Sequence, residues 1–226
     1  MGFEASGWGW TAIIPGFGLL AEDFTEPYLH LSHYTDTYVE FTPGIRLPTR
    51  SFPGTIGVAP AENGQHSVVP PRHVGGNLDI RDLVKGSTLY LPVEVPGALF
   101  SVGDTHAAQG DGEVCGTAIE TPMTLQARLS LKKKAELKRP QFEVTEPLRA
   151  DSEAKGYYAT TGIGPDLMSA AQDAVRDMIE HLGREYGLES KLAYTLCSVA
   201  VDLKISEIVD APNWVVSAYL PRAIFV

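Results

Sequence analysis

The sequence predicts an α+β fold in which β-strands dominate, with a β-sandwich-like core, a C-terminal helix pair and closing strands. Between residues 38 and 126, short apolar runs alternate with turn residues, which is the punctuation of strands. The 22 glycines and 16 prolines follow no period, as expected for many turns. We therefore expect a β-rich domain at 1–135, a connecting segment at 136–161, and a helix pair with two strands at 162–226.

The apolar runs give the expected strands. Pro92 and Pro96 flank residues 93–95, so that segment is expected at a sheet edge or a bulge, because proline cannot donate to a strand ladder. The other runs lie at 38–41, 54–59, 87–95, 98–102, 114–119 and 124–131.

The last third of the chain changes to helical spacing. Pro165 and Asp166 open a segment whose apolar residues recur every three or four positions, and we expect this helix to end near Gly183. Ser190 is the expected cap of a second helix. Alternating residues at 201–209 and 214–220 then predict two strands, joined by a turn at 210–213.

Composition excludes several classes of partner. The formal net charge is −10 and the sequence pI is about 5.0, so nucleic acid and anionic membrane surfaces would be repelled. No run approaches the roughly 18 apolar residues of a membrane span. Cys115 and Cys197 form no CxxC pair, so we expect a chain without disulfides that resides in the cytoplasm.

A dense polar cluster lies between two apolar runs, at residues 103–114. Asp104 and His106 are two residues apart, so an extended backbone would place both side chains on one face. A carboxylate with an imidazole is half of a common zinc ligand set, and the surrounding glycines and alanines allow close approach to the backbone. The alternative is an Asx turn beside an ordinary surface histidine.

Residues 103–121, GDTHAAQGDGEVCGTAIET, resemble the signature region of the acetamidase/formamidase family. The segments 10–20 (WTAIIPGFGLL) and 69–104, which includes VPPRHVGGNLDI, are similar to earlier blocks of that family, and 158–170 and 193–209 resemble its C-terminal helices and strands. The similarity runs in order over nearly the whole chain. The family's N-terminal β-rich block has no counterpart here, which puts catalysis by this chain alone in question.

The resemblance implies hydrolysis of a small aliphatic amide, formamide or acetamide, to the carboxylic acid and ammonia by a metal-activated water. It implies a divalent metal, zinc first and calcium as the alternative. We assign Asp104, His106 and Asp79 as metal ligands, although Asp79 could instead orient His106 through its second ring nitrogen or merely cap a Gly-Gly turn. Glu113 is our first choice for the catalytic base and Glu120 the second.

Asn77 and Gln109 are the residues expected to hold the amide substrate. Further metal ligands stay open among the loop histidines, which are His30, His33, His66 and His73. Cys115 lies between Val114 and Gly116 and is expected to be a small buried residue rather than a nucleophile.

We expect a homo-oligomer, because strands without the family's N-terminal block would keep an open edge, and open edges recruit partners. Two other interpretations remain. One is a non-catalytic, metal-stabilised β-sandwich binding module. The other is a structural subunit in which the polar cluster supports an interface.

Overall fold

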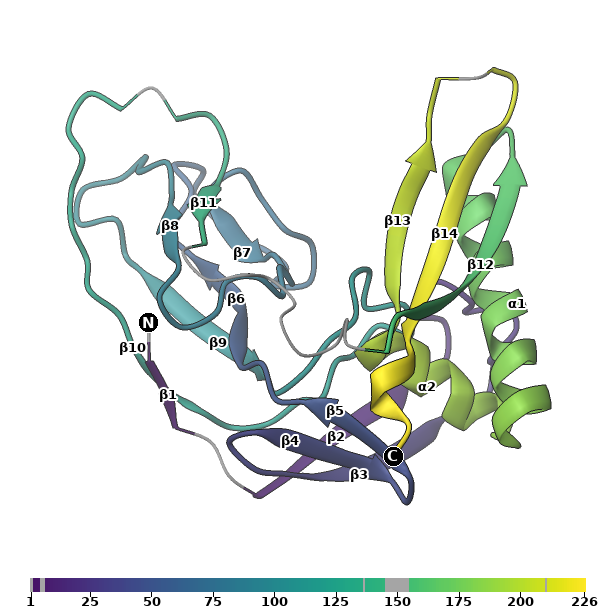
Figure 1. Cartoon of the computed structure of the whole chain (residues 1–226). Coiled ribbons are helices and arrows are strands. Elements are labelled where there is room, and N and C mark those ends of the chain that lie inside the picture. Colours follow the sequence, from purple (N-terminus) through teal and green to yellow (C-terminus); the bar gives the residue numbers. More distant parts are fainter. Residues whose placement is uncertain (1, 5–6, 136, 145–154, 210) are drawn as a thin grey trace.

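The computed structural model describes residues 2–4, 7–135, 137–144, 155–209 and 211–226. It confirms the predicted class: antiparallel β-sheets dominate, and a pair of helices with closing strands follows near the C-terminus (Figure 1). The N-terminal strands are β1 (Gly2–Glu4), β2 (Gly7–Ile13), β3 (Tyr28–Tyr34), β4 (Tyr38–Thr42), β5 (Ile45–Pro48), β6 (Phe52–Gly57), β7 (Gly75–Asn77), β8 (Thr88–Tyr90), β9 (Ser101–His106), β10 (Thr124–Gln126) and β11 (Gln141–Glu143). The C-terminal elements are β12 (Tyr157–Gly164), α1 (Leu167–Tyr186), α2 (Ser190–Ala200), β13 (Asp202–Glu207), β14 (Trp214–Pro221) and the short 3₁₀ helix η1 (Arg222–Ile224).

Two sheets meet at Glu120. Strands β2 to β5 form an antiparallel meander, and β6 lies between β7 and β9 in a second sheet. Glu120 bridges them, because its backbone pairs with Trp10 of β2 on one side and with His106 of β9 on the other. The amide of Trp10 donates to the Glu120 carbonyl at 3.0 Å, and the Glu120 amide donates back at 2.8 Å. The strand that ends in the polar cluster is thereby joined to the N-terminal meander.

The C-terminal unit is a three-stranded sheet, ordered β12-β14-β13, with α1 packed on one face (Figure 1). Gly162 of β12 allows this contact, because an added Cβ would lie 1.8 Å from the carbonyl oxygen of Ala170 in α1. The Thr160 hydroxyl donates to the Ala174 carbonyl at 2.7 Å across the same interface. The helix is therefore seated directly on the strand backbone.

The predicted helices form, with different ends. The helix α1 begins after Pro165 and Asp166, and Asp166 caps it by accepting from the Ser169 amide. The helix passes Gly183 and ends at Gly187, which takes the left-handed conformation at φ 66° and donates to the Gly183 carbonyl. Glu189, not Ser190, caps α2, and its side chain accepts from the amides of Lys191 and Leu192.

One core connects the two parts of the chain. Ile13 and Phe41 of the meander belong to the same buried apolar cluster as Met178 and Leu182 of α1 and Leu196 of α2. The domain boundaries 1–135, 136–161 and 162–226 therefore remain a proposal about folding units, and residues 136 and 145–154 of the connecting segment lie outside the described residues. No helix in the described part of the chain is both long and apolar enough to cross a membrane.

Several expected strands are shorter than predicted or absent. The strand expected at 98–102 begins only at Ser101, and of residues 124–131 only Thr124–Gln126 form a strand. Of residues 87–95 only Thr88–Tyr90 form a strand, which agrees with the prolines that follow. Residues 114–119 are buried but irregular, and their backbone groups bond to distant segments instead of to a ladder. The Val114 carbonyl accepts from the Leu19 amide at 2.8 Å, and the Ile119 amide donates to the Ala108 carbonyl at 3.0 Å. Apolar composition there reflects burial alone.

Candidate active site

The candidate site residues lie at the end of one strand and in two connecting segments, one after β7 and one between β9 and β10. Asp104 and His106 lie in β9 and not in the turn that the sequence suggested. Asp79 follows β7, Glu113 lies in the loop after β9, and Glu120 stands at the bridge between the sheets. All five candidates that we assigned to metal or to proton transfer are therefore brought together, although Asp79 and Glu120 are 41 positions apart in the chain.

The backbone is strained at three of these residues. Asp79, Asp104 and Glu113 have φ values of 49°, 51° and 44°, in the left-handed region that non-glycine residues seldom adopt. Each such conformation costs on the order of 1 kcal/mol or more, and strain of this kind gathers at functional sites. Aspartate tolerates the region better than glutamate does. The concentration of strain on three neighbouring carboxylates supports the assignment of a site.

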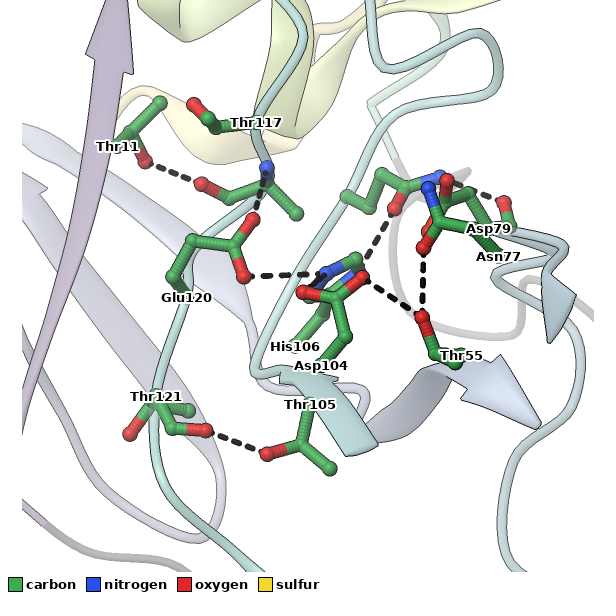
Figure 2. A network of polar contacts seen from close by, with 12 residues as sticks. Thr11, Thr55, Asn77, Asp79, Asp104, Thr105, His106, Thr117, Glu120 and Thr121 are labelled. Atoms are coloured by element: carbon green, nitrogen blue, oxygen red, sulfur yellow. Dashed lines mark hydrogen bonds and ion pairs between the residues drawn. The ribbon is translucent and has the colours of Figure 1, made fainter. Parts of the chain in front are cut away.

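The donor atoms form two groups that share His106. Asp79, Asp104 and His106 each offer a ligand atom within 4.8 Å of the others, and so do His106, Glu113 and Glu120. The His106 Nε2 atom lies 3.4 Å from Oδ1 of Asp104 and 3.2 Å from Oε2 of Glu120 (Figure 2). Four carboxylates thus surround one imidazole.

Second contacts hold several of these side chains. The Ala118 amide donates to Oε1 of Glu120 at 2.9 Å, so the other oxygen of that carboxylate is directed at His106. The Thr55 hydroxyl lies 3.4 Å from Oδ2 of Asp104 and donates to Oδ1 of Asn77 at 2.7 Å (Figure 2). On the far side of the imidazole, Nδ1 of His106 lies 2.9 Å from Oε1 of Gln109. Gln109, not Asp79, therefore occupies the orienting position on the second ring nitrogen.

Burial and neighbouring charges shift the pKa values of four site residues. Burial raises the pKa of Asp79 to about 6 and that of Glu113 to about 8, and the neighbouring carboxylates act in the same sense. Burial alone would lower the pKa of His106, but Asp104 and Glu120 outweigh it and raise that pKa to about 10. The His106 cation holds the pKa of Asp104 below its ordinary value. The protein by itself thus places excess negative charge around one cationic ring.

The residues fit a divalent cation. Oδ1 of Asp79 and Nε2 of His106 are buried polar atoms without a hydrogen-bond partner, which costs free energy unless something else binds them. An imidazole nitrogen with several carboxylate oxygens is a ligand set for zinc and related metals. Gly54 of β6 leaves room beside them, because an added Cβ would lie 2.5 Å from Oδ1 of Asp79 and 2.9 Å from Oδ2 of Asp104.

The other histidines left open as ligands contact residues outside the candidate site. His30 and His33 lie in strand β3 and not in loops, and the His33 ring packs edge-on against Trp8 with ring centroids 5.3 Å apart. Nε2 of His30 contacts the Phe41 carbonyl at 2.5 Å, and that of His66 contacts the Glu62 carbonyl at 2.9 Å. His73 pairs with Glu94 at 2.7 Å. In the part of the chain that the structure describes, none of these histidines belongs to a group of residues that could hold a metal ion.

Cys115 is fully buried, and burial raises the pKa of its thiol, so it lacks the properties of a nucleophile. Gly54 and Thr55 are the site residues that sequence reasoning missed. They lie in a run that only indicated a strand, and their roles depend on loops far away in the chain.

The loop after β9 is fixed to the C-terminal unit. The Gly110 amide donates to the Ser198 carbonyl at 2.8 Å, and an added Cβ on Gly110 would lie 2.1 Å from the Val201 carbonyl oxygen. The Leu203 amide donates to the Asp111 carbonyl at 3.0 Å. These contacts set where Glu113 can lie, so α2 and β13 contribute to the geometry of the site.

Comparison with known proteins identifies relatives of the chain. The model of the acetamidase/formamidase family matches residues 61–226. The formamidase of Methylophilus methylotrophus is 35% identical over 176 residues, which cover 70% of this chain and 41% of that protein. The chain thus spans about two fifths of the length of the curated relatives it matches.

Solved structures extend the likeness to almost the whole chain. A gamma lactamase from Delftia acidovorans superimposes with a TM-score of 0.89 at 27% identity, covering 97% of this chain and 69% of that one. An acetamidase from Bacillus halodurans gives a TM-score of 0.61 at 32% identity, covering 96% and 70%. Together with the family match over residues 61–226, these findings show that the chain belongs to the acetamidase/formamidase family.

Proposed function

We propose that this chain carries the catalytic centre of an amidase that hydrolyses a small aliphatic amide, formamide or acetamide, to the carboxylic acid and ammonia. The observation that carries the proposal is the pair of buried, unpartnered ligand atoms, Oδ1 of Asp79 and Nε2 of His106, in the midst of carboxylates. Two relatives of this chain are named formamidase and acetamidase.

Asp79, Asp104 and His106 would hold the cation, and Glu120, whose Oε2 lies 3.2 Å from Nε2 of His106, would complete the set. Zinc is the proposed metal, because it accepts mixed imidazole and carboxylate ligands, whereas calcium prefers oxygen ligands alone. When bound, a divalent cation supplies Lewis acidity, which makes water a better nucleophile and polarises an amide carbonyl.

Glu113 is the proposed proton carrier. Glu120 is held by the Ala118 amide and faces His106, whereas Glu113 comes from a loop and reaches the same group of atoms from another direction. In the proposed reaction Glu113 accepts a proton from water as the new C–O bond forms. It then returns that proton to the nitrogen as the C–N bond breaks, which releases ammonia and the acid.

Asn77 is proposed to orient the substrate. Its Oδ1 accepts from the Thr55 hydroxyl, so its NH₂ group is the end that can donate to a substrate carbonyl. Thr55 also lies close to Asp104, which would place the substrate carbonyl beside the cluster. A small amide is the proposed substrate, because the candidate ligand atoms beside this position lie within 4.8 Å of one another.

Ammonia release from formamide and acetamide is the direct test, measured on the full 226-residue chain with added Zn²⁺ and after chelation. We expect turnover with zinc, its loss on chelation, and its recovery on zinc return. Stoichiometric zinc binding without turnover of any amide would instead support a non-catalytic, metal-stabilised binding module.

Cyclic amides form a second candidate substrate class. The gamma lactamase superimposes on this chain with a TM-score of 0.89, against 0.61 for the acetamidase. Hydrolysis of γ-butyrolactam at a higher kcat/KM than acetamide would favour the cyclic class. Ring opening leaves the amine on the product and releases no ammonia, so the lactam reaction is followed by the appearance of the amino acid, under the same zinc and chelation conditions.

Assembly and location complete the proposal. Trp8, Trp10, Leu29 and Leu31 are exposed apolar residues on one face of the β2-β3 pair, which supports a homo-oligomer. Sedimentation at micromolar concentration tests it, and a monomer with full activity would contradict it. Cys115 and Cys197 are buried free thiols, in keeping with the cytoplasm.

A further inference from the structure

Gln109 spans two members of the candidate site. It is 5% exposed, and both ends of its side-chain amide are engaged. The Nε2 group donates to the backbone carbonyl of Asp79 at 2.8 Å, and Oε1 lies 2.9 Å from Nδ1 of His106. One side chain therefore contacts the backbone of one proposed ligand and the ring of another.

The chemistry of these partners fixes the proton on His106. A backbone carbonyl can only accept, so the NH₂ end of Gln109 must face Asp79 and the carbonyl end must face the imidazole. An amide carbonyl also can only accept, so Nδ1 of His106 must donate. Whenever the ring is neutral, its hydrogen is on Nδ1 and the lone pair is on Nε2.

That lone pair points into a negative environment. Nε2 of His106 is buried, makes no hydrogen bond of its own, and has oxygens of Asp104 and Glu120 at 3.4 and 3.2 Å. A neutral ring with this tautomer would oppose the carboxylates unless a cation lay between them. We propose that Gln109 is a positioning residue that selects the Nδ1–H form of His106 and so makes Nε2 a metal ligand.

This inference rests on the proposed metal site and changes the role first expected of Gln109. A substrate-binding amide needs groups that reach the substrate, but those of Gln109 are buried and directed at protein atoms. The same side chain also anchors the strained Asp79, whose carboxylate oxygen Oδ1 is unpartnered. Gln109 thus orients two proposed ligands at once.

Zinc affinity of three variants of the full chain, measured by calorimetry or chelator competition, tests the proposal. Gln109→Met keeps the length of the side chain and removes both hydrogen bonds, so we expect a loss of about 10–100-fold. Gln109→Glu keeps an acceptor for Nδ1–H but cannot donate to Asp79, and we expect most of the affinity to return. Gln172→Met is the matched control. Gln172 lies in helix α1, and its side chain likewise donates to a backbone carbonyl, that of Leu19 at 3.0 Å.

Each outcome decides a point. If Gln109→Glu binds zinc as poorly as Gln109→Met, anchoring of Asp79 is the whole role and the tautomer argument fails. If Gln109→Met keeps its zinc affinity and only KM rises, Gln109 contacts substrate and the proposal is overturned. If the wild-type chain binds no zinc, the proposed function itself fails, which this design separates from a failure at Gln109.

A measurement on the wild-type chain needs no variant to fold. Long-range ¹H–¹⁵N spectra of the zinc-loaded protein report which nitrogen of His106 carries hydrogen and which binds metal. We expect a protonated Nδ1 and a metal-bound Nε2. Binding through Nδ1 would refute the proposal.

Discussion

Gly54→Ala is the substitution whose effect can be worked out most directly from the structure. The added Cβ would lie 2.5 Å from Oδ1 of Asp79 and 2.7 Å from Cε1 of His106, whereas ordinary contacts begin at 3.4 Å. The Asp79 oxygen must therefore retreat by about 0.9 Å and the ring by about 0.7 Å. Displacements of this size cost about 100-fold in rate when they affect reacting groups.

The fold should tolerate the same change. The φ of Gly54 lies outside the positive range that strains other residues, so alanine can adopt the backbone. Over-packing costs roughly 1–3 kcal/mol, and the lower entropy of the unfolded alanine chain offsets about 0.4–1 kcal/mol of that. We expect a folded protein whose zinc affinity falls at least about 10-fold and whose amide turnover falls about 100-fold.

Gly103→Ala is the matched control on the adjacent strand. Gly103 pairs with Thr55, its φ is also outside the positive range, and an added Cβ meets nothing within 4 Å. Zinc titration, ammonia release and urea unfolding of both variants make the comparison. Wild-type affinity and rate in Gly54→Ala, or an equal loss in Gly103→Ala, would refute the argument that the missing side chain leaves room for the ligands.

Three further outcomes are expected. Asp104→Asn should lose zinc and activity with a change in Tm of no more than about 2–4 °C, because asparagine tolerates left-handed backbone; full metal occupancy at the wild-type rate would contradict the ligand assignment. Burial lowers the pKa of His30 below 6.5, so the stability that it contributes is complete above pH 6.5 and is lost as pH falls through the lowered value. Urea unfolding should therefore show that the free energy of unfolding falls more between about pH 7.5 and about pH 5 in the wild type than in His30→Gln. Equal falls would exclude His30 as a source of the pH dependence. Gly162→Ala should lose about 3 kcal/mol or more, because its Cβ would overlap the Ala170 carbonyl, while Gly164→Ala on the same strand, whose nearest contact is at 4.0 Å, should cost under about 1 kcal/mol.

The helices and the first two candidate ligands could be predicted because their signals are local. Asp166 caps α1 through a residue three positions away, and Asp104 and His106 share a face because they alternate in one strand. The end that the sequence predicts for α1, near Gly183, is too early. Gly183 stays helical, and of the two glycines only Gly187 takes the left-handed conformation. In the sequence alone, either of these two glycines could mark the C-terminal end of the helix.

The rest of the site depends on contacts between distant segments. Gly54 matters because Asp79 from the loop after β7 and two residues of β9, Asp104 and His106, come close to its Cα. Nothing in the residues that flank Gly54 in the sequence reveals this. Gln109 reaches Asp79, thirty residues earlier in the chain. Its amide looked available for a substrate because the sequence does not show that both ends are already bonded.

The way the N-terminal segment supports the site affects how this family can diverge. The family model matches from residue 61 onward, yet Trp10 holds Glu120, and the Gly54 carbonyl accepts from the amides of Leu78 and Asp79 at 3.0 and 3.2 Å. These are contacts between main-chain atoms, which nearly any amino acid can supply. At these points residues 7–57 can change side chains and still place the candidate carboxylates, provided that Gly54 keeps no side chain, whereas the buried core residues and Thr55 act through their side chains. Divergence at the exposed positions of this segment would remodel the surface around the site without moving its main-chain supports.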